Sequence, residues 1–331
     1  MISNGVYRYD FEKPIAELEH RLQDLRKGSD KTSRQLDGAA VRNLESQLEQ
    51  LKRKVYGSLT AWQRVQLARH PLRPYTLDYV QMIMAEFIEL HGDRLYGDDK
   101  ALVGGVARLN GQRLVVLGHQ KGRDTKENLM RNFGSAHPEG YRKALRLMRL
   151  AEKCRLPVVV FIDTPGAYPG IGAEERGQAH SIAFNMREMA RLKTSVYVCV
   201  IGEGGSGGAL GVGVGDWVAM LENAYYSVIS PEGCAAILWR DRARAPDAAE
   251  ALKMTGPDLL EMKLVDEVID EPSGGAHHDP NMVAQGVKES IQRFWKSIGS
   301  RPVEELVKQR YERFRRIGVW TSTAAQSAET S

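Results

Sequence analysis

The sequence predicts an α/β domain that is preceded by a helical hairpin and followed by two closing helices. Two observations lead to this prediction. Apolar residues repeat at spacings of three and four along residues 15–25 and 41–55, as they do on one face of a helix. Farther along the chain, short apolar or alternating runs typical of strands alternate with helix-like segments, an order that indicates an α/β domain.

Residues 1–75 are expected to form the helical hairpin and a linker. Residues 27–40 are polar and contain two glycines, so we expect the turn there. The apolar stripes are too short for a free-standing coiled coil. They pack either on the main domain or on a partner subunit, and the sequence leaves both alternatives open. The stripes are Ile15, Leu18, Leu22 and Leu25, and Val41, Leu44, Leu48, Leu51 and Val55.

The main domain is expected over residues 76–318, and residues 319–331 are expected to be a disordered tail. Asn110-Gly111 is a frequent hairpin turn, and the apolar run 157–162 indicates a buried strand. In order, we expect a helix over 76–91, strands over 101–109 and 113–120, a helix over 138–154, a strand over 157–162, a helix over 173–192, a strand over 195–201, a glycine-rich turn with a short helix, strands over 217–221 and 225–229, helices to about Met262, a strand over 265–269, a loop over 272–280 and two closing helices.

Composition and charge narrow the class of protein. The chain is 42% hydrophobic and 27% charged, and no stretch approaches the ~20 apolar residues that cross a membrane. No signal-like or transit-like segment opens it, so a cytoplasmic location is expected. The net charge is +4, and residues 1–75 carry the whole excess, which is too modest to require nucleic acid. The three cysteines form no Cys-x-x-Cys pair, so we expect no disulfide framework and no metal site.

Two glycine-rich segments each follow a predicted strand. In Asp163–Gly170, two prolines and two glycines fix an irregular backbone that can aim N–H groups at a developing negative charge. The structural alternative is a rigid connector. In Gly202–Gly211, a helix N-terminus without obstructing side chains is expected, which favours an anion or oxyanion site.

The second segment also matches two widespread motifs. Gly202-x-Gly204-x-x-Gly207 fits the dinucleotide fingerprint, but only nine residues separate it from the next strand, too few for a crossover helix. Gly204-x-Ser206-x-Gly208 fits the nucleophile elbow of serine hydrolases. Its candidate bases, His277 and His278, lie in a loop expected to be mobile, and the flanking glycines leave little to orient the serine.

Basic residues gather in two further places. On the helix 138–154, Arg142, Arg146, Arg149 and Lys153 share one face; Lys121, Arg123, Lys126 and Arg131 follow a strand. Such cations bind phosphates of a coenzyme or acidic groups of a carrier, but a solvated face is the simpler hypothesis.

Four motifs in this order identify a resemblance: Trp62–Pro71, Arg73–Tyr79, Ile162–Gly170 and Gly204–Ala209. Together they resemble the alpha-subunit family of bacterial-type acetyl-CoA carboxylase carboxyltransferase, over about residues 10–318. The resemblance implies a crotonase-like fold, in which ββα units wind into a spiral. It also implies transfer of a carboxyl group from carboxybiotin to acetyl-CoA, giving malonyl-CoA for fatty acid synthesis.

The family implies partners as well. These are a beta subunit that carries a zinc ribbon, in an α2β2 heterotetramer, a biotin carboxyl carrier protein and a biotin carboxylase. Biotin is expected on the carrier, since this chain has no Met-Lys-Met attachment motif. The alternatives to a carboxyltransferase are a serine hydrolase that uses Ser206 and a non-catalytic scaffold.

The resemblance also assigns roles to the glycine-rich segments. Carboxyl transfer creates one enolate-like oxygen on biotin and one on the thioester, and each needs preorganised N–H donors. By position this chain resembles the half that binds biotin. No side-chain base is required if biotin itself accepts the proton. The N–H groups near Gly166, Ala167, Gly207, Gly208 and Ala209 are expected to stabilise the biotin oxyanion, with Gly204, Gly205, Ser206 and Tyr168 in contact with the cofactor.

Overall fold

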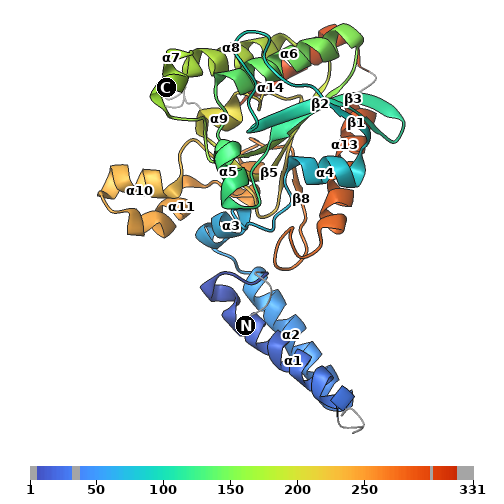
Figure 1. The fold of residues 1–331 in the computed structure, drawn as a ribbon, viewed down its shortest axis with the longest axis vertical. Coiled ribbons are helices and arrows are strands. Elements are labelled where there is room, and N and C mark those ends of the chain that lie inside the picture. The colour runs from blue at the N-terminus through green and yellow to red at the C-terminus, as the bar shows by residue number, and fades with distance from the viewer. Residues whose placement is uncertain (1–5, 32–37, 299–300, 319–331) are drawn as a thin grey trace, which may run out of the picture.

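The computed structural model describes residues 6–31, 38–298 and 301–318. It has an α/β body and a helical hairpin that projects from one end of it (Figure 1). One eight-stranded sheet has the order β1-β2-β3-β4-β5-β6-β8, with β7 paired to the distal part of β5. The pairs β1–β2 and β2–β3 are antiparallel, whereas the pairs from β3–β4 to β6–β8 are parallel. Among the described residues, no helix is long and apolar enough to span a membrane.

The elements follow the predicted order closely. The strands are β1 (Ala85–Glu89), β2 (Leu102–Leu109), β3 (Gln112–His119), β4 (Val158–Thr164), β5 (Val196–Gly205), β6 (Trp217–Leu221), β7 (Tyr225–Ser227) and β8 (Glu267–Ile269). The helices of the body are α3 (Ala61–Ala68), α4 (Thr76–Ile83), α5 (Thr125–Met130), α6 (Pro138–Cys154), α7 (Ile171–Glu175), α8 (Gln178–Arg191), α9 (Ser206–Leu210), α10 (Pro231–Trp239), α11 (Ala245–Leu252), α12 (Gly256–Glu261), α13 (Pro280–Ile298) and α14 (Val303–Arg315).

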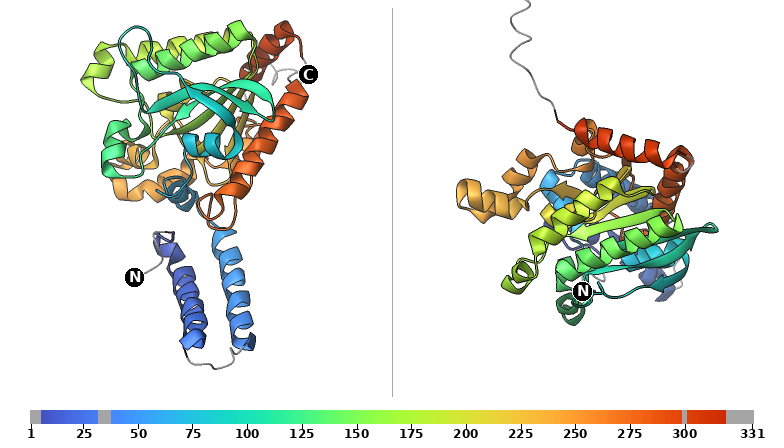
Figure 2. Two further views of the ribbon diagram at one scale, coloured as in Figure 1. Left: turned by 45° about the vertical axis from the view of Figure 1, so that its right-hand side comes forward. Right: turned by 90° about the horizontal axis from the view of Figure 1, so that it is seen from above.

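Helices cover both faces of the sheet. A Cβ at Gly104 in β2 would meet Leu147 of α6, and one at Gly118 in β3 would meet Thr76 of α4. Gly104 pairs with Leu117, and neighbouring residues of a strand point to opposite faces, so α6 and α4 lie on opposite sides. α8 lies beside α6, and α13 packs on α4 (Figure 2). Strands β4 and β5, in the middle, are therefore buried along their whole length.

The helix predicted over residues 76–91 is wrong beyond Ile83. The chain leaves α4 there and forms β1, which pairs with β2 through an irregularity between Ala85 and Ile88. Glu86 adopts a φ of 53°, and a Cβ at Gly105 would lie 2.0 Å from the Ile88 carbonyl oxygen. A missing side chain thus lets an edge strand dock, and apolar periodicity cannot reveal that long-range pairing.

Two more elements differ from prediction. The helix expected over 173–192 is divided into α7 and α8 at Gly177, which has a φ of 79°. The strand expected to end at Ile201 continues through Gly205, because β7 supplies a further pairing partner. The predicted tail, 319–331, lies outside the described residues.

The N-terminal hairpin has a core of its own. Helices α1 (Lys13–Lys31) and α2 (Gly38–Tyr56) pack their apolar stripes against each other, separately from the core of the body. Leu25 is the exception, since it is exposed. The alternative that the stripes pack on the main domain is therefore wrong. The buried carboxylate of Glu12 fastens the base of the hairpin, where it accepts hydrogen bonds from the Tyr56 hydroxyl and the Arg8 and Tyr9 N–H groups.

The C-terminal helix α14 is anchored by a buried ion pair. Arg310 pairs with Asp216 at 2.7 Å and also donates to the carbonyl oxygens of Met189, Leu192 and Thr194. Asp216 in turn accepts from the Val196 N–H at the start of β5. This single side chain therefore ties α14 to the end of α8 and the start of β5.

We expect Arg310→Met to reduce the free energy of unfolding by about 3 kcal/mol, because the change leaves the Asp216 carboxylate buried without its partner. Urea unfolding followed by circular dichroism measures the loss. Arg316→Met is the control, since Arg316 is 81% exposed and pairs with Glu312 at the surface; its effect should stay within about 0.5 kcal/mol. Equal effects of the two changes would contradict the anchoring role.

Candidate functional site

The two glycine-rich segments lie against each other at the carboxyl ends of β4 and β5. These strands are parallel neighbours, with Thr164 opposite Gly204. A Cβ at Gly208 would lie 2.5 Å from the Gly166 carbonyl carbon and 2.6 Å from the Ala167 nitrogen. One at Gly205 would similarly lie 2.2 Å from the Pro165 carbonyl oxygen. The glycines are thus required for backbone to touch backbone.

The N–H groups of the first segment are not equivalent. The Gly166 N–H donates to the Thr164 hydroxyl at 3.1 Å, and that hydroxyl donates back to the Gly166 carbonyl. The Tyr168 N–H donates to the Ala136 carbonyl. Within the described part of the chain, the Ala167 N–H takes part in no hydrogen bond. Of the two predicted donors in this segment, Ala167 is therefore available, whereas Gly166 is already engaged.

Gly166 serves another purpose. Its φ is 151°, and a Cβ there would have no atom within 4 Å. Open space beside the free Ala167 N–H is what a ligand needs in order to approach the backbone. The conformation and the space together explain a glycine here better than a need for a donor does.

The second segment opens α9. Ser206 adopts a φ of 50°, uncommon for a residue other than glycine, and is exposed. Gly207 and Gly208 occupy the first turn, where N–H groups have no carbonyl partner within their own helix. Gly208 and Ala209 are buried. The donors that the structure leaves for one anion are therefore Ala167 from one segment and Gly207 and Gly208 from the other. The predicted donor Ala209 is the fourth residue of α9, beyond the turn whose N–H groups lack a helical partner.

Tyr168 lies at the edge of this site. Its ring stacks on His137 with 4.1 Å between ring centres, and its carbonyl accepts from the Gln178 amide. The ring is partly exposed, so contact with a ligand is possible from one side only.

A buried ion network lies beneath both segments. The Lys121 ammonium donates to Asp163 at 2.6 Å and to Glu203 at 2.8 Å, and these carboxylates belong to the ends of β4 and β5. Glu203 also accepts from Arg69 at 2.7 Å and from the Tyr225 hydroxyl at 2.6 Å. The network ties the two strand ends to each other and to α3.

Burial and charge act oppositely on these groups. Burial alone would raise the pKa of Glu203, but the charges of Lys121 and Arg69 outweigh it and lower that pKa to about 2. Burial raises the pKa of Asp163 despite the nearby ammonium. For Lys121 burial acts to lower the pKa, and the two carboxylates more than reverse this. The network is thus built for charge balance, with Glu203 and Lys121 ionised.

Lys121 and Arg123, two of the basic residues that follow β3, were expected either to bind a phosphate or acidic group or to lie on a solvated face. Lys121 is neither solvated nor aimed at a ligand, because two buried carboxylates hold it. Arg123 is held as well, by the carbonyl oxygens of Pro71 and Arg73 and by Asp78. The local sequence could not reveal these partners, because they lie 42 to 82 residues away from Lys121 and 45 to 52 residues away from Arg123.

The predicted hydrolase bases lie elsewhere. His277 stacks on His70 at 3.8 Å and its side chain contacts the Val6 carbonyl, while His278 packs on Tyr7. The loop that carries the two histidines is thus packed at the base of the N-terminal hairpin, contrary to the expectation of a mobile segment. Among the described residues, no hydrogen bond joins either histidine to Ser206.

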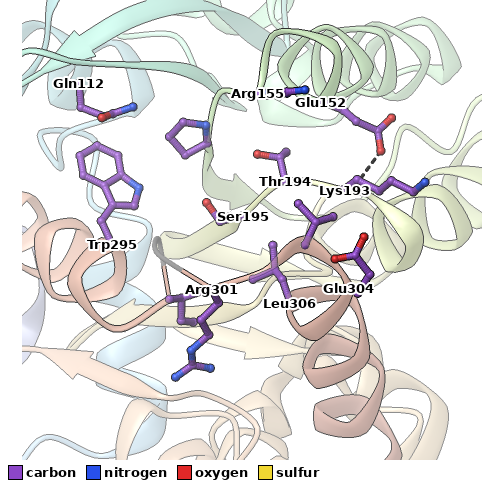
Figure 3. Close-up of a pocket in the computed structure, with 13 residues that line it drawn as sticks. Gln112, Glu152, Arg155, Lys193, Thr194, Ser195, Trp295, Arg301, Glu304 and Leu306 are labelled. Atoms are coloured by element: carbon purple, nitrogen blue, oxygen red, sulfur yellow. Dashed lines mark hydrogen bonds between the residues drawn. The ribbon is translucent and has the colours of Figure 1, made fainter.

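A cavity of about 760 Å³ lies at the opposite ends of the same strands (Figure 3). Pro157 and Ser195, which precede β4 and β5, line it together with Trp295 of α13. It therefore opens at the amino ends of the parallel strands, away from the glycine-rich segments, and is not part of the candidate site.

Comparison with known proteins decides the family. The family model described as acetyl co-enzyme A carboxylase carboxyltransferase-like matches residues 8–318. The acetyl-coenzyme A carboxylase carboxyl transferase subunit alpha of Geobacter metallireducens is 53% identical over 312 residues, covering 94% of this chain and 97% of that protein. The subunit of the same name from Thermus thermophilus is 54% identical over 311 residues, covering 94% and 98%. The chain belongs to this family.

Solved structures show the fold of the family. Transcarboxylase 12S, with methylmalonyl-coenzyme A bound, superposes with a TM-score of 0.54 at 20% identity, over 68% of this chain and 42% of that chain. A Pseudomonas malonate decarboxylase hetero-tetramer in complex with coenzyme A gives 0.54 at 16% identity, over 67% and 91%. The predicted crotonase-like fold is confirmed. Because the relatives are named carboxyl transferase subunits, the serine hydrolase alternative is rejected.

Gly208 and Gly207 form a matched pair for testing the contact between the segments. Gly208→Ala should reduce the free energy of unfolding by about 2 kcal/mol, because the added methyl group overlaps the Gly166 backbone. Gly207→Ala should be neutral or slightly stabilising, since its Cβ would meet Ile182 at an ordinary 3.6 Å. Urea unfolding of both variants measures this difference. A Gly208→Ala protein as stable as wild type would contradict the close packing.

Proposed function

We propose that this chain supplies the biotin-binding half of the carboxyltransferase of a multi-subunit acetyl-CoA carboxylase, in which a carboxyl group passes from carboxybiotin to acetyl-CoA and malonyl-CoA forms. Family membership supports the reaction class. The observation that supports the role of this chain is the convergence of the Ala167 N–H with the first turn of α9 beside the open space at Gly166.

The site fits the ureido group of biotin. That group is neutral and flat, and when bound as carboxybiotin it supplies the carboxyl group for transfer. A flat ligand with one strongly accepting oxygen suits a shallow backbone cradle, and the missing Cβ at Gly166 leaves room for it. The Ala167, Gly207 and Gly208 N–H groups would hold the ureido oxygen and stabilise the negative charge that gathers on it. One such donor lowers the free-energy barrier of the reaction by a few kcal/mol.

The network of Lys121, Asp163 and Glu203 acts indirectly in this proposal. It fixes the strand ends from which both segments start, so the N–H groups are oriented before the ligand arrives. The ionised groups satisfy one another, so none is expected to accept the substrate proton. This agrees with the hypothesis that no side-chain base in this chain is required.

The partners are proposed with the function. A beta subunit of similar fold, which carries a zinc ribbon, would supply the second oxyanion site, for the thioester. A biotin carboxylase would carboxylate the biotin attached to the carboxyl carrier protein. The carrier would then bring the carboxybiotin to an α2β2 assembly. Solved structural neighbours are themselves assemblies, such as the malonate decarboxylase hetero-tetramer.

Dependence on a partner is testable. The isolated chain should show no carboxyl transfer, because it offers one oxyanion site and the reaction creates two negative oxygens. Activity should appear when a beta subunit is added, measured as biotin-dependent decarboxylation of malonyl-CoA. Transfer by the isolated chain at the rate of the complex would contradict the proposal.

The cradle itself is tested at Gly166. Gly166→Ala places a methyl group in the open space beside the Ala167 N–H and strains the backbone, so carboxyl transfer should fall by about 100-fold, the scale of losing one oxyanion donor. Assembly with the beta subunit should persist. Gly111→Ala is the matched control, because Gly111 also has a positive φ and no atom near its Cβ, but lies in the β2–β3 turn.

The rates must be compared on assembled protein, checked by gel filtration. If Gly166→Ala retains the rate of Gly111→Ala in both directions of the reaction, the space at Gly166 does not receive the ligand.

A further inference from the structure

A second pocket carries a concentration of positive charge. It has a volume of about 700 Å³ and lies between α6, α8 and the loop of residues 92–97 that follows β1. Asp93 is the only carboxylate among its lining residues. The arginines that line it are Arg94, Arg142, Arg146, Arg149 and Arg176.

Three of these arginines have their charge balanced. Asp93 is itself engaged further, by the N–H groups of Leu95, Tyr96 and Gly97, and is thus a structural group of the loop. The pairs are Arg142 with Asp93 at 2.8 Å, Arg149 with Glu188 at 3.0 Å, and Arg176 with Glu139.

Arg94 and Arg146 differ from the other three. Arg94 donates to the His91 carbonyl at 3.0 Å, and Arg146 donates to the carbonyls of Gly92 and His91 at 3.0 and 3.1 Å. No carboxylate of the described residues forms an ion pair with either guanidinium. Burial and the positive charge of Arg94 lower the pKa of Arg146, and the negative charges of Asp98 and Asp93 oppose this only in part. The fold therefore holds two like charges beside each other, at a cost that a bound anion would remove.

The loop that presents Arg94 is itself strained. Arg94 adopts a φ of 65°, which few residues other than glycine adopt. Such strain costs of order 1–3 kcal/mol and persists where the surrounding structure imposes it. The hydrogen bonds of Asp93 to the loop and to Arg142 impose it here, and they hold Arg94 over the pocket.

The pocket also has an apolar wall. Phe184 and Leu145 line it, and Leu95 at its rim is 79% exposed. The Phe184 ring lies 5.8 Å from the Arg149 guanidinium. A ligand that combines charge with a flat or apolar part would contact both kinds of surface.

The pocket adjoins the candidate site. Asn185, which lines it, donates to the carbonyls of Tyr141 and Gly211, and the Tyr141 hydroxyl donates to the Gly208 carbonyl. Arg146 follows Tyr141 along α6 by about 8 Å. Asn185 and Tyr141 are both buried, so this connection runs through the interior of the protein and links the wall of the pocket to the backbone of the candidate site.

We propose that this arginine pocket binds the phosphate groups of a small phosphorylated organic ligand. Guanidinium groups suit phosphate because their N–H donors match its oxygens in pairs. Two sources share this chemistry: the phosphates of the acyl-coenzyme A substrate, a version that rests on the proposed function, and a separate phosphorylated metabolite that regulates the enzyme.

Inorganic pyrophosphate is the probe, and calorimetry on the full-length chain is the measurement. The wild-type chain should bind it saturably, more weakly as salt rises. Arg94→Gln and Arg146→Gln should each weaken binding by about tenfold, the effect of losing one charge-assisted contact. Arg191→Gln should bind as wild type, because this exposed arginine ends α8 outside the pocket. Arg94 is exposed in a loop, so its variant keeps the test valid if Arg146→Gln fails to fold.

Absence of saturable pyrophosphate binding to the wild-type chain, or equal binding by all three variants, would overturn the proposal. This readout does not depend on enzyme activity, so failure of the proposed function is seen separately.

Steady-state kinetics of the assembled enzyme then distinguish the two sources. If the substrate supplies the phosphates, KM for acetyl-CoA rises in Arg94→Gln and Arg146→Gln while kcat is kept. If a separate metabolite supplies them, KM is unchanged although pyrophosphate binding is weakened.

Discussion

The ammonium group of Lys121, held between Asp163 and Glu203, is the interaction on which the rest of the site depends. Asp163 and Glu203 belong to the ends of β4 and β5, and without a cation between them their carboxylates would repel each other in a buried setting. Arg69 adds a second cation and brings α3 under the same strand ends. Charge balance thus sets where the two glycine-rich segments begin.

Close contact between the segments follows from that starting position. Once β4 and β5 end side by side, Gly208 can rest on the Gly166–Ala167 peptide, and a side chain at 208 would separate them. The same contact brings the Ala167 N–H next to the first turn of α9. In the proposed function, backbone N–H groups hold the ligand and no titratable group is needed, which agrees with the mutual pairing of Lys121, Asp163 and Glu203.

Arginines serve two different purposes in this chain. Arg310 and Arg73 are buried and fully paired, with Asp216 and Glu271 respectively, and they fasten helices and loops to the sheet. Within the described ranges, Arg94 and Arg146 bond only to carbonyl oxygens, and both line an open pocket. The sequence shows all four as similar basic residues. Only their partners, which are distant in sequence, separate an internal anchor from a cation that is available to a ligand.

The sequence by itself determined the family, the α/β class and most elements, because these depend on local patterns. Helix α6 runs over the predicted residues, and Asn110 and Gly111 both adopt the positive φ that their turn requires. The sequence also singled out both glycine-rich segments as a candidate site, and the structure places them against each other at the ends of β4 and β5.

Only the tertiary structure decided which atoms of those segments are available. The Gly166 N–H was predicted to be a donor to the ligand, but it donates to the Thr164 hydroxyl instead. Gly208 is a packing residue, and its N–H lies in the first turn of α9. The strand β1, hidden in a helix-like pattern, formed because β2 offered an edge with a glycine at the point of contact. In each case the deciding contact joins residues whose proximity the fold creates, and local sequence patterns do not encode that distance.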